Sequence, residues 1–393
     1  MIESELDPYS EESLRNPHAQ HAQLRDAGPV VWLSKYSIWA MARYEEVNSA
    51  LRDHETFCSS AGVGISNFHH EEPWRPPSLL LEADPPAHTP VRSVVTRILT
   101  RQKLEVLRTS LEQKANVLID ELLEKGGNID GVSELCELFP LQVFPDAVGL
   151  KSSDRHMLLP YADMAFNAFG PRNALLEEST KNAAPVAGWI ADQCQRSALN
   201  ETGFGAQIYA AADAGNITHE QAPLLVRSLL TAGMDTTIHG LGHTVHCLAA
   251  NPEQWQKLRQ NTELSRAALD EAVRLVSPVQ TFYRTTTRAV DIGGTQIEKD
   301  QKVLLILASA NRDPRRWERP DEYDIERETR GHVGFGAGIH MCVGQMLARL
   351  EAEVLLTALA KKVESIELLE APDLRLNNTL HALARLPLRL KPV

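Results

Sequence analysis

Residues 332–354, HVGFGAGIHMCVGQMLARLEAEV, place a single cysteine between a glycine-rich run and an apolar helical pattern. Gly336 and Gly338 permit a tight turn with positive φ and leave room for a flat, bulky group against the backbone. After Cys342, apolar side chains recur at helical spacing, at positions 343, 346, 347, 350 and 354. We therefore expect the sulfur at a helix N-terminus, where free N–H groups and the helix dipole stabilise a thiolate. The alternative is a small buried cysteine at the start of a core helix.

The composition excludes several classes of protein. A hydrophobic content of 43% in 393 residues is enough for a sizeable core. The 40 basic and 52 acidic residues give a net charge of −12, which argues against a general nucleic-acid binder. The five cysteines are odd in number and widely spaced, so they predict no disulfide framework and suit a reducing cytosol. No run of eighteen apolar residues and no signal peptide appears, so we expect no membrane span and a cytoplasmic location.

Most of the chain has helical periodicity, and two short regions predict small sheets. Residues 28–47 and 281–309 contain β-rich runs, and the second region includes a hairpin turn at DIGGTQI, residues 291–297. The longest predicted helix starts at Pro223 and ends before Pro252, which corresponds to about 29 residues and roughly 43 Å. Its apolar residues lie on nearly all sides, so we expect it to be buried. The predicted fold is mainly α with small β-sheets.

The predicted long helix contains TAGMDTT, residues 231–237, with a glycine in its interior. Thr236 can bond to a carbonyl one turn earlier and distort the helix, which would open a groove for a diatomic ligand. The alternative is a set of ordinary polar residues that face solvent. Arg227 lies in the apolar run LLVRSLL and needs either solvent or an anion. Helical spacing predicts that positions 228, 231, 232, 235 and 236 share one face.

A thiolate with helix N–H donors and glycines beside it is what an axial haem ligand requires. The run FGAGIHMCVG, residues 335–344, resembles the haem-binding signature F-G-x-G-x-H-x-C-x-G of the cytochrome P-450 monooxygenases at every fixed position. The resemblance implies that Cys342 is the proximal iron ligand of haem b, that Phe335 packs near its sulfur, and that His340 reaches a haem propionate. It also implies a triangular prism in which haem lies between the long central helix and the cysteine-loop helix. Residues 1–393 are expected to form one catalytic domain.

Other positions match the same family. Glu271 and Arg274 of EAVR lie one helical turn apart, where an ion pair is natural, although such pairs are common on surfaces. The resemblance implies that this pair binds Arg327 and holds the cysteine loop. It further assigns His88, Arg92 and Arg284, together with His340, to the two haem propionates, which require cationic partners.

The resemblance makes Asp235 the acid and Thr236 the alcohol of an oxygen-activating pair. Both residues are present, which favours a true monooxygenase over a non-catalytic haem sensor or carrier, because a carrier needs no proton delivery. A helical binding protein without haem would require the whole cysteine-loop match to be accidental. The chain has no flavin or iron–sulfur signature. The expected electron donor is therefore a [2Fe-2S] ferredoxin with an NAD(P)H-dependent flavin reductase, and the basic stretch around Arg97 and Arg101 is a candidate docking face.

The strings PWRPPS, FNAFG, LLVRSLL and QTFYR resemble a bacterial subfamily that oxidises para-substituted benzoic acids, with O-demethylation of 4-methoxybenzoate to 4-hydroxybenzoate and formaldehyde as its best-known reaction. The resemblance implies that the carboxylate binds Arg75, Ser78 and Ser228 and that Arg227 closes the entrance. Aromatic walls would hold the ring, and apolar or small residues would complete the pocket: Phe166, Phe169, Phe282, Leu81, Thr231, Ala232 and Val279. Thr231 departs from an expected serine, so the preferred para group stays open. The alternatives are hydroxylation of a related 4-substituted benzoate, a cinnamate or a methoxyphenol.

Overall fold

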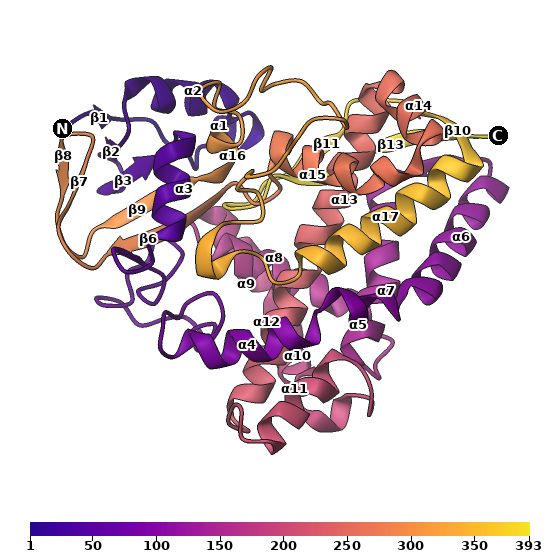
Figure 1. The fold of residues 1–393 in the computed structure, drawn as a ribbon, viewed down its shortest axis with the longest axis horizontal. Helices are drawn as coiled ribbons and strands as arrows, with labels where there is room; N and C mark the ends of the chain where they lie inside the picture. The colour runs from indigo at the N-terminus through magenta and orange to yellow at the C-terminus, as the bar shows by residue number, and fades with distance from the viewer.

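The computed structural model describes residues 1–393 and has a triangular outline in the view of Figure 1. The strands β1–β3 and β6–β9 lie together at the side of the N-terminus, and helices make up most of the remainder. The predicted mainly α fold with small sheets is therefore confirmed. No helix has both the length and the apolar character needed to cross a membrane.

The α-helices are α1 (Glu11–Arg15), α2 (His18–Ala27), α3 (Tyr44–Arg52), α4 (His88–Ile98), α5 (Arg101–Glu105), α6 (Arg108–Glu124), α7 (Leu138–Val148), α8 (Leu158–Asn167), α9 (Ala174–Ala183), α10 (Ala187–Gln193), α11 (Phe204–Asp213), α12 (Gln221–Gly233), α13 (Asp235–Ala250), α14 (Pro252–Gln260), α15 (Ser265–Val276), α16 (Leu307–Ala310) and α17 (Gln345–Lys362). A short 3₁₀ turn, η6 (Gly338–His340), precedes α17. The strands are β1 (Glu3–Ser4), β2 (Val31–Leu33), β3 (Ile38–Met41), β4 (Phe57–Cys58), β5 (Asn128–Asp130), β6 (Thr281–Thr286), β7 (Val290–Ile292), β8 (Thr295–Ile297), β9 (Lys302–Ile306), β10 (Val363–Leu368), β11 (Asp373–Arg375), β12 (Ala382–Arg385) and β13 (Pro387–Pro392).

The largest sheet joins the two regions that the sequence predicts as strands. Its order is β1-β2-β3-β9-β6-β4, with β3 parallel to β9 and β6 antiparallel to β9. The predicted hairpin is confirmed by the pairing of β7 with β8. Gly293 and Gly294 form its turn with φ of 59° and 82°, a conformation that glycine adopts without strain. Phe282 and Arg284 lie on β6 of this sheet, opposite Leu305 and Val303 of β9.

The prediction of one continuous helix from Pro223 to Asn251 is wrong. The helix starts earlier, and it is interrupted at Met234, which separates α12 from α13 with φ −90° and ψ −74°. At the break, the hydroxyl of Thr236 donates to the carbonyl of Ala232 at 2.7 Å. Thr237 likewise donates to the carbonyl one turn earlier, at 3.0 Å. These hydroxyls occupy acceptors that an unbroken helix would use for its own N–H groups, as the predicted distortion at Thr236 requires.

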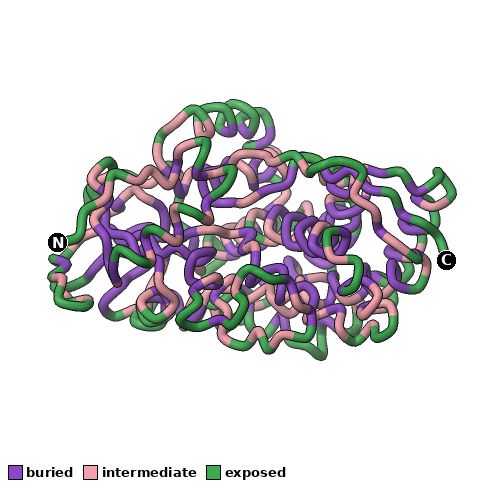
Figure 2. The backbone as a smooth tube through the Cα atoms, turned by 90° about the horizontal axis from the view of Figure 1, so that it is seen from above, coloured by how far each residue is buried: buried purple, intermediate pink, exposed green.

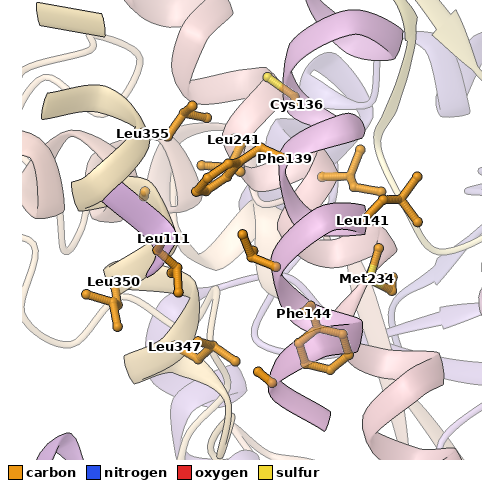
Figure 3. Packing of buried hydrophobic residues seen from close by; sticks show 14 of the residues in the cluster. Leu111, Cys136, Phe139, Leu141, Phe144, Met234, Leu241, Leu347, Leu350 and Leu355 are labelled. Carbon is orange, nitrogen blue, oxygen red and sulfur yellow. The ribbon is translucent and has the colours of Figure 1, made fainter. Parts of the chain in front are cut away.

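A cluster of 71 buried hydrophobic residues fills the space between the central helices. In Figure 3, Leu347 and Leu350 of α17, Leu241 of α13 and Phe144 of α7 all lie in one packed region. Gly233 is required here, because a Cβ atom at this position would lie 2.4 Å from the ring of Phe144. Figure 2 shows that buried positions run through the interior of the molecule and that exposed ones gather at its rim.

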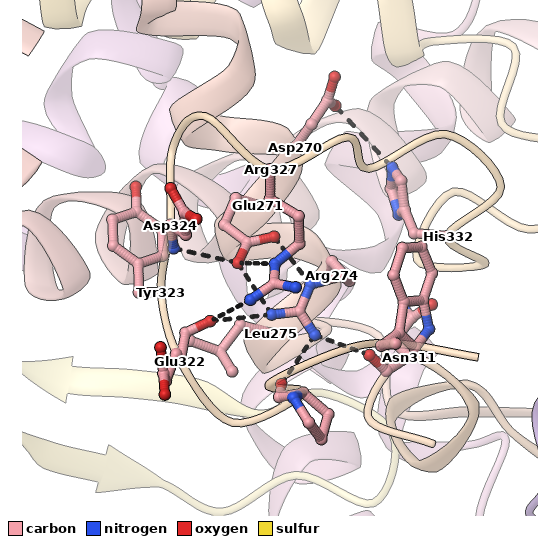
Figure 4. A network of polar contacts seen from close by, with 12 residues as sticks. Asp270, Glu271, Arg274, Leu275, Asn311, Glu322, Tyr323, Asp324, Arg327 and His332 are labelled. Carbon is pink, nitrogen blue, oxygen red and sulfur yellow. Dashed lines mark hydrogen bonds and ion pairs between the residues drawn. The ribbon is translucent and has the colours of Figure 1, made fainter. Parts of the chain in front are cut away.

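A buried ion network connects α15 to the segment that leads into the cysteine loop (Figure 4). Glu271 accepts two hydrogen bonds from Arg274, at 2.7 and 2.9 Å, and one from Arg327 at 2.9 Å, so these three residues are in contact. Arg274 also donates to the carbonyl of Asn311 at 2.9 Å. The side chain of Asn311 in turn accepts the N–H of Val333 at 2.7 Å. The network therefore ties the start of the cysteine loop to the helical core.

Removal of the shared carboxylate should destabilise the protein strongly. Glu271→Ala leaves the fully buried guanidinium of Arg274 without a counter-ion, and we expect a loss of about 3–5 kcal/mol in unfolding free energy. Urea denaturation followed by circular dichroism measures this loss. The control is Glu11→Ala, which removes an exposed ion pair with Arg15 and should cost less than about 1 kcal/mol. Equal losses of unfolding free energy in the two variants would contradict the large stabilising contribution that we assign to the buried network.

Candidate active site

The cysteine loop presents the sulfur of Cys342 just before α17. The N–H of Cys342 donates to the carbonyl of Phe335 at 2.7 Å, which closes the loop on itself. Gly336 and Gly338 have φ of 69° and 67°, as the turn requires, and a Cβ on Gly338 would lie 2.5 Å from the carbonyl oxygen of Leu51. Burial raises the pKa of the Cys342 thiol. The N–H groups at the start of α17 oppose this shift because they bond to the sulfur.

The sulfur opens into a cavity that most of the predicted site residues share. The cavity is lined by 40 residues, 23 of them hydrophobic, so its interior is mainly apolar. Its wall includes the predicted substrate residues and most of the predicted haem residues: Arg75, Ser78, Leu81, Arg92, Phe166, Phe169, Arg227, Ser228, Thr231, Ala232, Thr236, Val279, Phe282, Arg284, Phe335, His340 and Cys342. Asp235 and His88 are absent from this wall. The fold thus gathers positions that are up to 267 residues apart (from 75 to 342) around one space.

The polar groups at the cavity edge fit a haem with two propionates. Arg284 is buried, donates only to the carbonyl of Tyr283 at 2.7 Å and pairs with no carboxylate. Burial lowers its pKa to about 10, so it remains a cation at neutral pH and needs an anion. The Nε2 atom of buried His88 has no hydrogen-bond partner, and its ring lies 4.7 Å from that of His340. Arg92 reaches the cysteine loop through the carbonyl of Met341 at 2.5 Å.

His340 already has protein partners at both ring nitrogens. Its Nδ1 lies 3.1 Å from the carbonyl of Leu80, and its Nε2 lies 3.5 Å from the carboxylate of Asp84. Burial tends to raise the pKa of Asp84, but His340 and the N–H groups of Ser59 and Ser60 outweigh it and hold this pKa at about 2. His340 therefore connects the cysteine loop to the loop that precedes α4. Its assignment to a propionate stays a prediction, and Asp84 is a residue that the sequence analysis missed.

Asp235 does not share a face with the cavity residues, so the predicted stripe through position 235 is wrong. Asp235 directly follows the break at Met234, its side chain is 2% exposed, and it is not part of the cavity wall. Its Oδ2 lies 3.4 Å from Nη2 of Arg375, which also donates to Nε2 of His239 at 3.0 Å. Burial raises the pKa of Asp235 to about 7, and Arg375 partly offsets this shift. Asp235 is thus poised to hold or release a proton behind Thr236.

Arg375 is a candidate functional residue without any signal in the sequence. It lies on β11, 140 residues after Asp235, and its side chain is 39% exposed. Its Nε lies 3.6 Å from the carboxylate of Asp163 on α8. The side chain therefore bridges the buried acid to the protein surface. Nothing in the local pattern around Arg375 distinguishes it from an ordinary strand arginine.

Polar residues gather at another part of the cavity. The hydroxyls of Ser78 and Ser228 lie 3.4 Å apart, and Arg227 donates to the carbonyl of Pro76 at 2.9 Å. Arg75 bonds to the carboxylate of Glu82 at 2.8 Å. The predicted anion-binding residues are therefore brought together, but with a carboxylate among them that the sequence analysis missed.

Aromatic side chains form another part of the cavity wall. The ring of Phe169 lies 5.9 Å from that of Phe166 and 5.8 Å from that of Phe282, in edge-to-face arrangements. Leu81 and Val279 pack against the same cluster. Because aromatic rings in this arrangement are held firmly, the wall is suited to a flat ring.

The buried acid gives a pH-dependent contribution to stability. Its pKa is higher in the folded protein, about 7 against an ordinary 3.8, so its contribution is fully present below pH 3.8 and is lost as the pH rises through 7. Between pH 5 and pH 8, we expect the unfolding free energy of the natural protein to fall by roughly 2–3 kcal/mol relative to Asp235→Asn. Urea denaturation at both pH values measures the difference. Asp213→Asn, at an exposed carboxylate with a lowered pKa, should show no such change. Parallel pH profiles for the natural protein and Asp235→Asn would contradict the assigned pKa.

Comparisons with known proteins agree with this geometry. The family model described as Cytochrome P450 matches residues 202–387. The chain is 54% identical over 387 residues to cytochrome p450 CYP199A2 of Rhodopseudomonas palustris, which covers 98% of this chain and 94% of that protein. The solved cytochrome P450 CREJ, in complex with (4-ethylphenyl) dihydrogen phosphate, has a TM-score of 0.86 at 26% identity and covers 98% of this chain and 99% of that chain. CYP109Q5 from Chondromyces apiculatus has a TM-score of 0.81 at 30% identity and covers 99% of this chain and 98% of that chain. The chain belongs to the cytochrome P450 family and is a haem-thiolate monooxygenase with haem b as its cofactor.

Proposed function

We propose that this monooxygenase oxidises small aromatic carboxylic acids at the para substituent, with O-demethylation of 4-methoxybenzoate-type acids to 4-hydroxybenzoates and formaldehyde as the main reaction. One observation carries the proposal. A mainly apolar cavity joins the sulfur of Cys342 to a polar group of two arginines and two serines. Such a cavity suits a molecule with a charged end, a flat apolar middle and a reactive group at the opposite end.

The proposed binding mode follows from the chemistry of the lining residues. Arg75, Ser78 and Ser228 would hold the carboxylate, because guanidinium and hydroxyl groups donate to carboxylate oxygens. Ser228 on α12 and Thr236 on α13 line the same cavity on the two sides of the break at Met234, so a substrate held at Ser228 would extend toward Thr236. The ring would lie against Phe169 and its neighbours. A rigid substrate held at one end has its para group fixed near the cysteine loop, which favours reaction there.

The residues around the cysteine loop support the proposed chemistry. Cys342 would hold the iron of haem b through its sulfur, and the bound group would supply the activation of O₂ with two electrons. The hydroxyl of Thr236 donates to the carbonyl of Ala232, so its oxygen would accept a hydrogen bond from a water molecule at the cavity wall and hold that water in place. Asp235, with a pKa of about 7, would supply protons and regain them from solvent beside the partly exposed Arg375, which itself stays protonated. One oxygen atom enters the O–CH₃ group, whose hemiacetal separates into phenol and formaldehyde, while the other atom leaves as water with two protons.

Electrons would come from a [2Fe-2S] ferredoxin and its NAD(P)H-dependent flavin reductase in the cytoplasm. Arg97 and Arg101 are exposed at the junction of α4 and α5 and form no ion pair. The same helix α4 reaches the cysteine loop through Arg92. A positive surface next to the cysteine loop would favour an acidic electron donor.

The substrate assignment predicts a clear order of ligand affinities. We expect 4-methoxybenzoate to bind the purified holoenzyme and shift its haem spectrum. The neutral isostere 4-methoxybenzamide should bind at least about tenfold more weakly, because it lacks the charge that pairs with arginine. Turnover with a ferredoxin and reductase should release formaldehyde and 4-hydroxybenzoate in equal amounts. Equal affinity for 4-methoxyphenol, which lacks the carboxylate, would contradict the proposal.

The proposed docking surface predicts a selective effect on electron transfer. Reversal of charge in Arg97→Glu/Arg101→Glu should slow ferredoxin-supported turnover by about tenfold or more at low salt, with substrate affinity unchanged. The control is Lys299→Glu, at an exposed position in the loop between β8 and β9. Unchanged turnover in the double variant would place the ferredoxin elsewhere.

A further inference from the structure

Glu82 is a buried carboxylate inside the group of residues that we assign to the substrate carboxylate. Its side chain is only 3% exposed. A single oxygen, Oε2, accepts both the guanidinium Nη1 of Arg75 at 2.8 Å and the backbone N–H of Ser78 at 2.7 Å. An acid among anion-binding groups needs an explanation, because it repels the ligand that the neighbouring cations attract.

The two arginines are held close together by the chain itself. Arg75 donates to the carbonyl of Pro76 at 3.0 Å, and Arg227 donates to the same oxygen at 2.9 Å. Burial lowers the pKa of Arg227, and the charge of Arg75 lowers it further. Two guanidinium groups on one carbonyl therefore repel each other, and Glu82 compensates one of the two charges.

The other titratable neighbours do not change this balance. Tyr161 and Cys194 interact with Arg227, and burial raises the pKa of Cys194 to about 12, so its thiol is neutral. Burial lowers the pKa of Lys302 to about 7 although Glu82 opposes this shift, so Lys302 is mostly neutral at pH 8. Its Nζ donates to the carbonyl of Gly62 at 2.7 Å and lies outside the cavity wall. The two arginines and Glu82 therefore give the site a net charge of +1 before the ligand binds.

We propose that Glu82 limits this site to monoanionic aryl acids and excludes dianionic ones; the inference rests on the proposed function. A carboxylate brings one negative charge, and the site becomes neutral when it binds. An aryl phosphate with a second pKa of about 6 brings almost two charges at pH 8, which leaves the weakly hydrated site with a net negative charge. Glu82 is thus a specificity-determining residue for the charge of the substrate.

Glu82 also has a structural role that must be separated from its charge. Its N–H donates to the carbonyl of Ser78 at 2.9 Å, and its carboxylate holds the N–H of Ser78. Loss of this turn would displace the hydroxyl that lies near Ser228. A purely structural effect would weaken the binding of all ligands by the same factor. Loss of the negative charge would instead strengthen the binding of anions, and more so for a dianion than for a monoanion.

The experiment compares three ligands of similar size in the purified holoenzyme at pH 8: 4-methoxybenzamide, 4-methoxybenzoate and 4-methoxyphenyl phosphate. Dissociation constants come from calorimetry and from the haem spectrum. In Glu82→Gln, which keeps an acceptor for Ser78 but removes the charge, phosphate affinity relative to benzoate should rise by at least about tenfold. Benzoate affinity relative to benzamide should rise by a smaller factor.

Two further variants keep the test decisive if Glu82→Gln folds poorly. Glu82→Asp retains the charge and should keep the preference for benzoate over phosphate, even if all three ligands bind more weakly. Arg75→Gln/Glu82→Gln restores a net charge of +1 and should return this preference toward that of the natural protein. A phosphate-to-benzoate ratio that stays within about twofold in Glu82→Gln, or that changes equally in Glu82→Asp, would overturn the inference. If the natural protein does not bind 4-methoxybenzoate at all, the proposed function itself fails, which is a separate result.

Discussion

The carboxylate of Glu271 holds two arginines in the interior, and the position of the cysteine loop depends on it. Arg274 is completely buried and uses its remaining donors on backbone carbonyls of the segment that leads into the loop. A buried charge is costly unless each of its hydrogen bonds is satisfied, and a partly broken network costs more than its absence. The arrangement therefore has a narrow geometry. The side chain of Asn311 accepts the N–H of Val333, so the start of the cysteine loop is held in position relative to Arg274.

The break at Met234 gives neighbouring residues of the central helices different environments. Thr236 lies on the cavity wall, while Asp235 is buried behind it with Arg375 and His239. Successive side chains on a helix lie about 100° apart, and the hydroxyl bonds of Thr236 and Thr237 accompany the interruption of the helix at this point. The acid is thereby kept out of the apolar cavity and is still close to the polar surface through Arg375. The acid that we propose as the proton source is thus separated from the space that we propose for the substrate.

The polar part of the cavity and the haem-facing part use different electrostatic arrangements. Arg284 has no protein carboxylate as a partner, so it remains available to an external anion. Arg75, in contrast, is already paired with Glu82. When a protein carboxylate neutralises an arginine, as Glu82 does for Arg75, that arginine attracts an anionic ligand less strongly. An arginine without such a partner, like Arg284, needs an anion from outside the chain. The net charge at the haem-facing part therefore suits the haem propionates, and the net charge at the polar part suits a single substrate carboxylate.

Much of this protein follows from short-range patterns. The glycines and the cysteine of residues 332–354, the ion pair of Glu271 with Arg274, and the β7–β8 hairpin are local, because the interacting residues lie within one turn of helix or one tight turn. The continuous helix over Met234 was a wrong prediction, since the hydroxyls that interrupt it compete with backbone bonds of similar strength, and a local pattern does not decide between them. Arg375, Asp84 and Glu82 have ordinary sequence neighbours, and they gain their importance from partners on other elements or from burial that the folded chain imposes. The difference is physical. Helical and turn preferences act over a few residues, whereas the pKa of Asp235 depends on Arg375 and the charge balance at Arg75 depends on Arg227, which the fold brings from distant parts of the chain.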